Sequence, residues 1–352
     1  MSSRRRLAIF DFTRSVTRKN GSMSLDPKQT HVLHEWKHGK PLIACCFDPN
    51  GRFLFTSSED YTLQRWNLED GSKVAWEAHD SWIRDIAFLP DGETVITAGC
   101  DDRIIFWPVA GDKPQPRSEV IAHKGWVRSV DVNKDGTLVA TGGNDHLVKL
   151  WDPDGKLVRE LAGHQGHVYS VFFHPDGETL LSGDLKGVVH QWETKTGKLT
   201  RSFEAKELFT YNTGQQVDYG GVRDIALSPD GKTLALTGLH KATNPLGAVN
   251  EPLVMLFDWE KGELIRNQPA DGVKGTGCQI KFLSDGSEVC ASGGSGGGYL
   301  VFFNSNEEKP FHKLKLKDTA RDMSLHPDGL QIATTHWDGY VRICRMEQKT
   351  AT

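Results

Sequence analysis

Short runs of apolar residues alternating with polar ones recur along most of the chain, in pairs joined by a glycine turn. WIRDIAF and ETVITAG form one such pair, and HVYSVFF and ETLLSG form another. Runs of this length, rich in Val, Ile, Thr and aromatic residues, are typical of β-strands. The turn between them reads LPDG or HPDG, in which proline presets φ and glycine tolerates a positive φ. Each pair is therefore predicted to be a β-hairpin.

The hairpin signal occurs seven times. Its turn glycines, 41, 44, 41, 54, 55 and 43 residues apart, are Gly51, Gly92, Gly136, Gly177, Gly231, Gly286 and Gly329. A third run such as HLVKLWD follows each hairpin, and most repeats add a weaker fourth run such as KLVRELAGH. Four strands in about 42 residues make one propeller blade, and no helical period that would suit a parallel sheet lies between the runs. The sequence predicts an all-β, seven-bladed β-propeller with four antiparallel strands per blade.

The two ends of the repeat region predict how the ring closes. The seventh repeat stops after its third strand, YVRICRM, and so lacks an outer strand. Residues 30–36, THVLHEW, resemble the outer strand of another repeat. We expect this N-terminal strand to complete the last blade, which would remove the open sheet edges. The expected organisation is a basic extension over residues 1–29, one propeller over 30–346 and a tail over 347–352.

The repeats resemble the WD-repeat family over about residues 30–346. Trp151-Asp152 and Gly163-His164 match the family's dipeptides in full. The degraded equivalents are Trp66-Asn67, Trp107-Pro108, Trp192-Glu193, Phe257-Asp258, Ala78-His79 and Ala122-His123. The resemblance supports the propeller, because several weak copies in register are more specific than one strong copy.

A polar constellation recurs in the first four repeats. In each one a His precedes a turn position by 22 residues, a Ser or Thr lies four residues before that position, and a Trp lies six residues after it. The four sets are His38, Thr56, Asp60 and Trp66; His79, Thr97, Asp101 and Trp107; His123, Thr141, Asp145 and Trp151; and His164, Ser182, Lys186 and Trp192. The resemblance implies that each set forms a structural hydrogen-bond chain from indole through hydroxyl and imidazole to carboxylate.

The same residue types also resemble a Ser/Thr-His-Asp catalytic triad. Recurrence argues against catalysis, because an active site is normally built once. A closed chain also gives each buried polar group its partner. Lys186 departs from the pattern, and repeats five to seven lack the His, although Thr334 and Asp338 keep part of it. We expect the second half to depend more on apolar packing.

The segments that lead into the innermost strands carry the candidate binding residues. Equivalent positions hold Arg84, Arg128, Tyr169, Arg223 and Arg321, and two residues earlier stand Trp82, Trp126 and His167. The resemblance gives a similar role to the residues before the turn Asp, which are Glu59, Cys100 and Asn144. Arginine and aromatic residues are typical of binding hot spots, and guanidinium groups suit carboxylates or phosphates. Alternatively, each Arg pairs with a carboxylate such as Asp85, Asp224 or Asp322 on an adjacent blade, and the Trp residues pack under loops. The sequence leaves both interpretations open.

The two longest intervals contain insertions at residues 206–221 and 239–252. Insertions in propellers usually form loops, and long loops are often functional. Each insertion is expected to be a loop that either contacts a partner or acts as a neutral spacer.

Composition narrows the function. The chain is 38% hydrophobic and 25% charged with a net charge of −4, so no chain-wide field attracts nucleic acid or an anionic membrane. Its six cysteines show no paired CxxC spacing, which argues against a disulfide framework or zinc site. The apolar run that ends at Phe12 is too short for a signal-peptide core, and no run is long enough to cross a bilayer. We expect a cytoplasmic protein that is not inserted in a membrane and does not bind nucleic acid.

The sequence therefore predicts a non-catalytic scaffold that binds a protein or peptide through the propeller rim and central channel. No cofactor, metal site or unrepeated nucleophile is expected. The alternative is an enzyme or a sensor of a small ligand or metal, with Asp85, Asp224 and Asp322 as the channel carboxylates. A metal or small molecule retained by the purified protein would favour that alternative.

Overall fold

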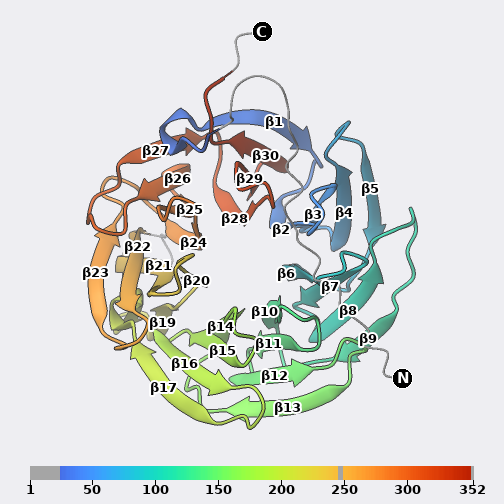
Figure 1. Ribbon diagram of the computed structural model, residues 1–352, viewed down its shortest axis with the longest axis horizontal. Helices are drawn as coiled ribbons and strands as arrows, with labels where there is room; N and C mark the ends of the chain where they lie inside the picture. Colours follow the sequence, from blue (N-terminus) through green and yellow to red (C-terminus); the bar gives the residue numbers. More distant parts are fainter. Residues whose placement is uncertain (1–23, 245–248, 350–352) are drawn as a thin grey trace, which may run out of the picture.

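The computed structural model describes residues 24–244 and 249–349. These residues form seven four-stranded antiparallel sheets, arranged as blades around a central opening (Figure 1). Each blade runs outward from an innermost to an outermost strand. This arrangement confirms the predicted seven-bladed propeller.

The first four blades use consecutive strands. Blade 1 is β2 (Leu42–Phe47), β3 (Phe53–Ser58), β4 (Thr62–Asn67) and β5 (Lys73–Glu77); blade 2 is β6 (Ile83–Phe88), β7 (Thr94–Gly99), β8 (Arg103–Pro108) and β9 (Ser118–Ile121); blade 3 is β10 (Val127–Val132), β11 (Val139–Gly143), β12 (Leu147–Trp151) and β13 (Leu157–Ala162); blade 4 is β14 (Val168–Phe173), β15 (Thr179–Asp184), β16 (Val188–Glu193) and β17 (Leu199–Glu204).

The remaining blades complete the ring. Blade 5 is β20 (Asp224–Leu227), β21 (Thr233–Asn244), β22 (Val249–Asp258) and β23 (Leu264–Pro269); blade 6 is β24 (Thr276–Phe282), β25 (Glu288–Gly294), β26 (Gly297–Phe303) and β27 (His312–Leu316); blade 7 is β28 (Ala320–Leu325), β29 (Gln331–His336), β30 (Tyr340–Arg345) and β1 (His31–Lys37).

Strand β1 closes the ring by pairing antiparallel with β30, from His31 opposite Arg345 to Lys37 opposite Tyr340. Figure 1 shows β1 on the outside of β30, where it is the outermost strand of the last blade. The chain before β1 includes the short 3₁₀ helix η1 (Pro27–Gln29), and the N–H of Asp26 donates to the carbonyl of Met346. The two ends of the described chain are thereby joined by backbone hydrogen bonds.

Neighbouring blades pack face to face through apolar side chains. Phe55 and Trp76 of blade 1 pack against Ile83, Phe88 and Trp107 of blade 2 in one buried cluster. Equivalent clusters join the later blades, including the second half, where few polar chains are present. Each sheet therefore buries both faces, which explains why its strands are apolar at nearly every inner position.

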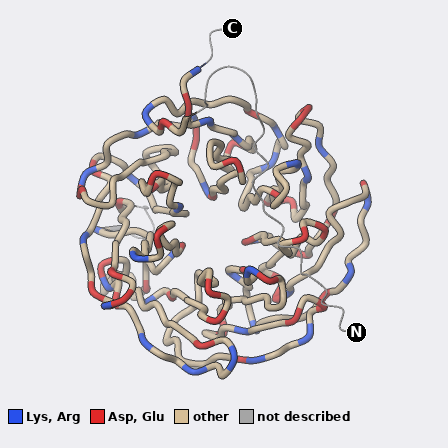
Figure 2. The backbone as a smooth tube through the Cα atoms, viewed as in Figure 1, with Lys and Arg blue, Asp and Glu red and all other residues tan. Residues whose placement is uncertain are grey.

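The innermost strands line a channel with a cavity of about 770 Å³. In an antiparallel blade, the connection into the first strand and the turn between the second and third strands lie at the same end. We call this end of the ring the arginine rim. Figure 2 shows both acidic and basic positions along the inner edge of the ring.

Both insertions extend from the arginine rim, but they are hairpins rather than the expected loops. The first forms the 3₁₀ helix η2 (Lys206–Leu208) and a hairpin of β18 (Phe209–Asn212) and β19 (Val217–Gly220). The second lengthens β21 and β22 beyond the blade, and residues 245–248 lie outside the described ranges. The two pack together, and Asn250 Nδ2 donates to the hydroxyl of Tyr219 at 3.0 Å. Cross-strand pairing within each insertion satisfies backbone groups that a loop would leave to solvent.

Candidate partner-binding rim

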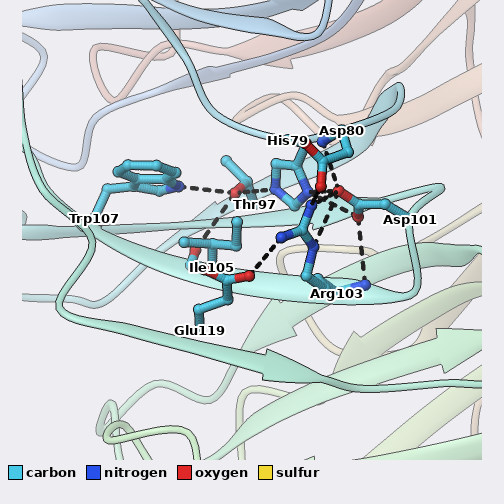
Figure 3. Close-up of polar contacts among 8 residues, drawn as sticks. All are labelled: His79, Asp80, Thr97, Asp101, Arg103, Ile105, Trp107 and Glu119. Carbon is cyan, nitrogen blue, oxygen red and sulfur yellow. Dashed lines mark hydrogen bonds and ion pairs between the residues drawn. The ribbon is translucent and has the colours of Figure 1, made fainter.

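The polar constellation of blade 2 is a continuous chain of hydrogen bonds (Figure 3). Trp107 Nε1 donates to the Thr97 hydroxyl at 3.0 Å, Thr97 lies 2.7 Å from His79 Nε2, and His79 Nδ1 lies 2.9 Å from Asp101. A carboxylate only accepts, so Nδ1 of a neutral His79 carries the proton and Nε2 accepts from Thr97. Burial opposes ionisation of Asp101, but the hydrogen bonds donated by His79, the Asp80 N–H and Arg103 outweigh it and lower the pKa of Asp101.

Blades 3 and 4 repeat this chain. In blade 3 the links are Trp151–Thr141, Thr141–His123 and His123–Asp145, at 2.9, 2.8 and 2.7 Å. In blade 4 they are Trp192–Ser182, Ser182–His164 and His164–Asp184, at 2.8, 2.7 and 2.9 Å. The expected carboxylate position of blade 4 holds Lys186, which instead pairs with Asp218 of the insertion hairpin at 2.7 Å. Asp184, two residues earlier at the end of β15, supplies the carboxylate that the sequence spacing missed.

Blade 1 differs from the expected chain. Trp66 Nε1 donates to Thr56 and His38 contacts Asp60, at 2.8 and 2.9 Å. The predicted link between His38 and Thr56 is wrong, because Gln64 lies beside Thr56 on the adjacent strand and accepts its hydroxyl proton at 2.7 Å. In blade 7, Thr334 contacts His336 of its own strand at 2.8 Å, and Asp338 pairs with Arg342. Gln64 in blade 1, and His336 and Arg342 in blade 7, thus take the place of the His that the repeat pattern expects.

The chains are structural in character because their hydroxyls are inaccessible. Thr97, Thr141 and Ser182 are each 0% exposed, and the three linked imidazoles are buried. A nucleophile must reach its substrate, so these groups cannot act on one without opening the blade. Each group instead gives a buried neighbour its hydrogen-bond partner.

The rim arginines lie around the mouth of the channel. Arg84, Arg128, Arg223 and Arg321 all line the cavity, together with Tyr169. The Arg128 and Arg223 guanidinium carbons lie 4.3 and 4.4 Å from the centre of the Tyr169 ring, within the range of cation–π contacts. The structure thus gathers these five predicted residues at one end of the channel.

Three other predicted rim residues, Glu59, Asn144 and His167, contact the arginines or one another. Arg321 pairs with Glu59 across the junction of blades 7 and 1 at 2.8 Å. Arg128 Nε donates to the Asn144 side chain, and the Asn144 carbonyl lies 2.8 Å from His167 Nδ1. These contacts join the start of an innermost strand to a turn between second and third strands, within blade 3 and across the junctions of blades 7 and 1 and of blades 3 and 4.

Trp82, Cys100 and Trp126 complete the predicted set. The Trp82 carbonyl accepts the Cys100 N–H at 2.8 Å, and Trp126 lies 5.0 Å from the Arg128 guanidinium and is 38% exposed. Burial raises the pKa of Cys100 to about 11, although Arg84 and Arg128 partly offset this. The Cys100 thiol is therefore neutral at pH 7 and adds no negative charge beside the arginines.

The alternative, in which each rim arginine pairs with a carboxylate of an adjacent blade, holds for Arg321 and its partner Glu59 but, among the described residues, not for Arg84, Arg128 or Arg223. The channel aspartates have other partners. Asp85, Asp131 and Asp322 instead accept backbone N–H groups of the next blade, from Val130, Phe173 and Cys45, at 2.9, 2.6 and 2.7 Å. Asp224 likewise accepts from Ile280 N–H and from Lys281, at 2.9 and 3.0 Å. We call Asp85, Asp131, Asp224 and Asp322 the aspartate belt. Each belongs to an innermost strand and fastens it to the neighbouring one, which is why the carboxylates are not available to the arginines.

Burial raises the pKa of three belt carboxyls. The pKa of Asp85 is raised to about 6, and those of Asp131 and Asp322 to about 7, because the groups are desolvated and lie near one another's charges. Among the described residues no group of three or more His, Cys, Asp or Glu side chains is placed to hold a metal ion.

Comparison with known proteins places the fold in a family. The sequence pattern described as "WD domain, G-beta repeat" matches residues 28–67, 72–108, 114–152, 155–193 and 309–344, more than half of the chain. The chain belongs to the WD-repeat family. The matches fall on blades 1 to 4 and blade 7 of this WD-repeat protein.

Several curated proteins are similar to this WD-repeat chain. It is 22% identical to Protein groucho of Drosophila melanogaster over 179 residues, which are 49% of this chain and 24% of that relative. It is 27% identical to Nuclear distribution protein nudF of Emericella nidulans over 175 residues, 44% of this chain and 39% of the relative. The nudF protein of Aspergillus niger is also 27% identical, over 173 residues. The matched segment thus spans 24% to 39% of these relatives' own length.

The structure shows four exposed aromatic residues, of which the sequence analysis predicted only Trp126. Within the described ranges, the exposed aromatic side chains are Tyr61, Trp126, Tyr211 and Trp337, and all four lie on connections at the arginine rim. Tyr61 adopts a φ of 69° in the turn after β3, and Trp337 lies 4.9 Å from the Arg321 guanidinium. For Tyr61 and Trp337 the signal available in the sequence was their position after a second strand, but only the fold shows that these turns share the face with the arginines. In the described part of the chain, no helix is long and apolar enough to span a bilayer.

Proposed function

We propose that this WD-repeat propeller is an interaction scaffold that holds a peptide segment or protein against the arginine rim and the mouth of the channel. The observation that carries the proposal is the coincidence of two residue sets on one face. The exposed aromatic side chains of the described residues and the arginines at the mouth of the channel share the same end of the ring. Tryptophan, tyrosine and arginine are the residues most enriched in binding hot spots.

An enzyme or a sensor of a small ligand or metal receives less support from the geometry. The buried hydroxyls and imidazoles are hydrogen-bonded to one another, and the belt carboxylates accept hydrogen bonds from backbone N–H groups. A rigid ring closed by paired strands suits a platform, because a pre-organised surface loses little entropy when it binds. The protein class of the partner and the cytoplasmic location stay predictions.

The test is affinity capture with the intact chain beside the variant Arg84→Glu/Arg128→Glu, followed by identification of what is lost. Reversing two central charges should lower partner affinity at least about 100-fold, the size expected when two hot-spot residues fail. The matched control is Lys156→Glu/Lys198→Glu, which makes the same charge change at exposed positions far from the channel mouth. Capture that survives in the arginine variant, with the fold intact by circular dichroism, would refute binding at this rim.

A further inference from the structure

Four consecutive blades place cations and one aromatic ring at equivalent positions of the channel mouth. Arg84, Arg128, Tyr169 and Arg223 begin or directly precede the innermost strands of blades 2, 3, 4 and 5. The other three blades hold Ile43, Cys278 and Arg321 at this level. The unneutralised positive charge is therefore confined to one side of the mouth, and we call Arg84, Arg128 and Arg223 the arginine arc.

Two members of the arginine arc have buried donors that lack a partner. The Nε atoms of Arg84 and Arg223 are buried and make no hydrogen bond. Arg128 Nε donates to the neutral amide of Asn144. Across residues 24–244 and 249–349, no carboxylate forms an ion pair with any of the three guanidinium groups. Arg321, on the other side of the mouth, does have such a partner in Glu59.

The environment of the arginine arc makes this lack of a counter-charge costly. Burial, together with the charges of Arg84 and Arg223, lowers the pKa of Arg128 to about 10. Burial and the charge of Arg84 also lower the pKa of Arg223. Desolvated like charges repel one another strongly, whereas an anion in the same place would receive several charge-assisted hydrogen bonds.

We propose that the arginine arc binds one anionic group, a carboxylate or a phosphate, carried by the segment that docks on the rim. The inference rests on the proposed function and sharpens it, because it states which chemistry the partner must present. The guanidinium carbons of Arg128 and Arg223 both lie over the Tyr169 ring, while the exposed Trp126 ring lies 5.0 Å from Arg128. The anion sits toward blades 2 to 5, beside the hairpin β18–β19, and fixes the register of the partner on the rim.

The phosphate source is tested with inorganic phosphate as the probe. The melting temperature of the full chain is measured in sodium phosphate and in sodium chloride of equal ionic strength. Phosphate should raise it by a few degrees in the native chain and in the control Lys156→Gln/Lys198→Gln, but not in Arg84→Gln/Arg128→Gln. The single variant Arg84→Gln, which changes less of the mouth, provides a second folded comparison.

The carboxylate source is tested with a displayed library of twelve-residue peptides, which contains carboxylates but no phosphates. Peptides selected on the native chain should be enriched at least fivefold in Asp and Glu, and should bind Arg84→Gln/Arg128→Gln at least tenfold more weakly. A response in either test that depends on the arginines supports the inference and identifies the source of the anion.

The inference falls if neither response depends on the arginines. Selected peptides without acidic enrichment that lose binding in Trp126→Ala/Trp337→Ala would leave the proposed function standing and overturn the anion site alone. Peptides indifferent to both the arginine and the tryptophan variants would overturn the rim as a binding surface as well.

Discussion

The arginine arc and three of the four belt aspartates lie in or next to the innermost strands of blades 2, 3 and 5, yet the arginines and the aspartates differ in their partners. Each belt aspartate accepts a backbone N–H of the neighbouring blade, and Asp224 also accepts from Lys281. The arc arginines have no carboxylate partner among the described residues, and two of them keep a buried, unbonded Nε. The aspartates thus have hydrogen-bond partners within the fold, whereas the arginines keep donors that can bind a ligand.

Whether a buried polar group finds its hydrogen-bond partners within the fold is a better guide to a structural or a functional role than its residue type is. A buried group whose hydrogen bonds are complete contributes to stability, and its removal leaves another group without a partner. A buried group without a partner costs stability and is retained where binding needs it. The following experiments test whether the charged residues of this ring divide along that line.

The largest effect is expected in the hydrogen-bond chain of blade 3. Asp145→Ala removes the acceptor of His123, which is only 2% exposed, and should lower the free energy of unfolding by about 1–3 kcal/mol. Chemical denaturation measures this loss, and binding at the rim should be unchanged. Lys186→Ala is the matched control, because it holds the equivalent sequence position in blade 4 but only a half-exposed ion pair, worth about 0–1 kcal/mol. Equal losses in the two variants would contradict the partnered role of Asp145.

A smaller effect is expected in the aspartate belt. Asp322→Ala leaves the Cys45 N–H without its acceptor at the junction of blades 7 and 1. The loss should be about 1–2 kcal/mol, because water in the channel can replace part of the hydrogen bond. Asp322→Asn keeps an acceptor oxygen and should restore most of the stability. Denaturation curves for the two variants that coincide would show that the hydrogen bond does not fasten the blades.

Sequence reasoning reached the ring and the recurring chain because both rest on spacing. Seven turn glycines and a missing last strand were sufficient to predict the closed propeller, which the structure confirms. Spacing failed where a neighbour could substitute: Asp184 replaces Lys186 in blade 4, and Gln64 displaces His38 from Thr56 in blade 1. Asp184 ends the strand just before Lys186, and Gln64 lies opposite Thr56 on the paired strand. These positions become visible only when the strand pairing is known.

The sequence predicted the positions of the rim arginines but not their partners. Equivalent positions identified Arg84 and Arg128, but one sequence could not decide whether aspartates neutralise them. That outcome depends on which way each carboxylate points, and Asp85 and Asp322 point toward backbone N–H groups of the next blade. The exposure of Tyr61 and Trp337 depends on tertiary packing and was equally out of reach.

The pH dependence should distinguish the belt from the hydrogen-bond chains. The folded-state pKa of Asp322 is raised to about 7, so its contribution to stability is complete below about pH 4 and is lost as the pH rises through 7. The pKa of Asp145 is lowered to about 2, so its contribution is complete above about pH 4 and is lost as the pH falls toward 2. Between pH 5 and 8, Asp322→Asn should gain about 2–3 kcal/mol on the native chain, because about two pH units of this range lie below the folded-state pKa. Parallel stability curves across this range would argue that Asp322 stays ionised.

The smallest effect has the opposite sign and tests the comparison most directly. Arg84→Met keeps much of the side-chain volume but removes one charge from the arginine arc and one buried Nε that has no partner. Because Arg84 repels both Arg128 and Arg223, its loss should leave the ligand-free protein as stable or more stable, by up to about 0.5–1 kcal/mol, while anion binding weakens. Thermal unfolding without phosphate measures the gain, and Arg321→Met, which breaks the pair with Glu59, should lose stability instead. A clear loss of stability in Arg84→Met would mean that Arg84 is a structural group like the aspartates, and the division between the two sets of charges would fail at that residue.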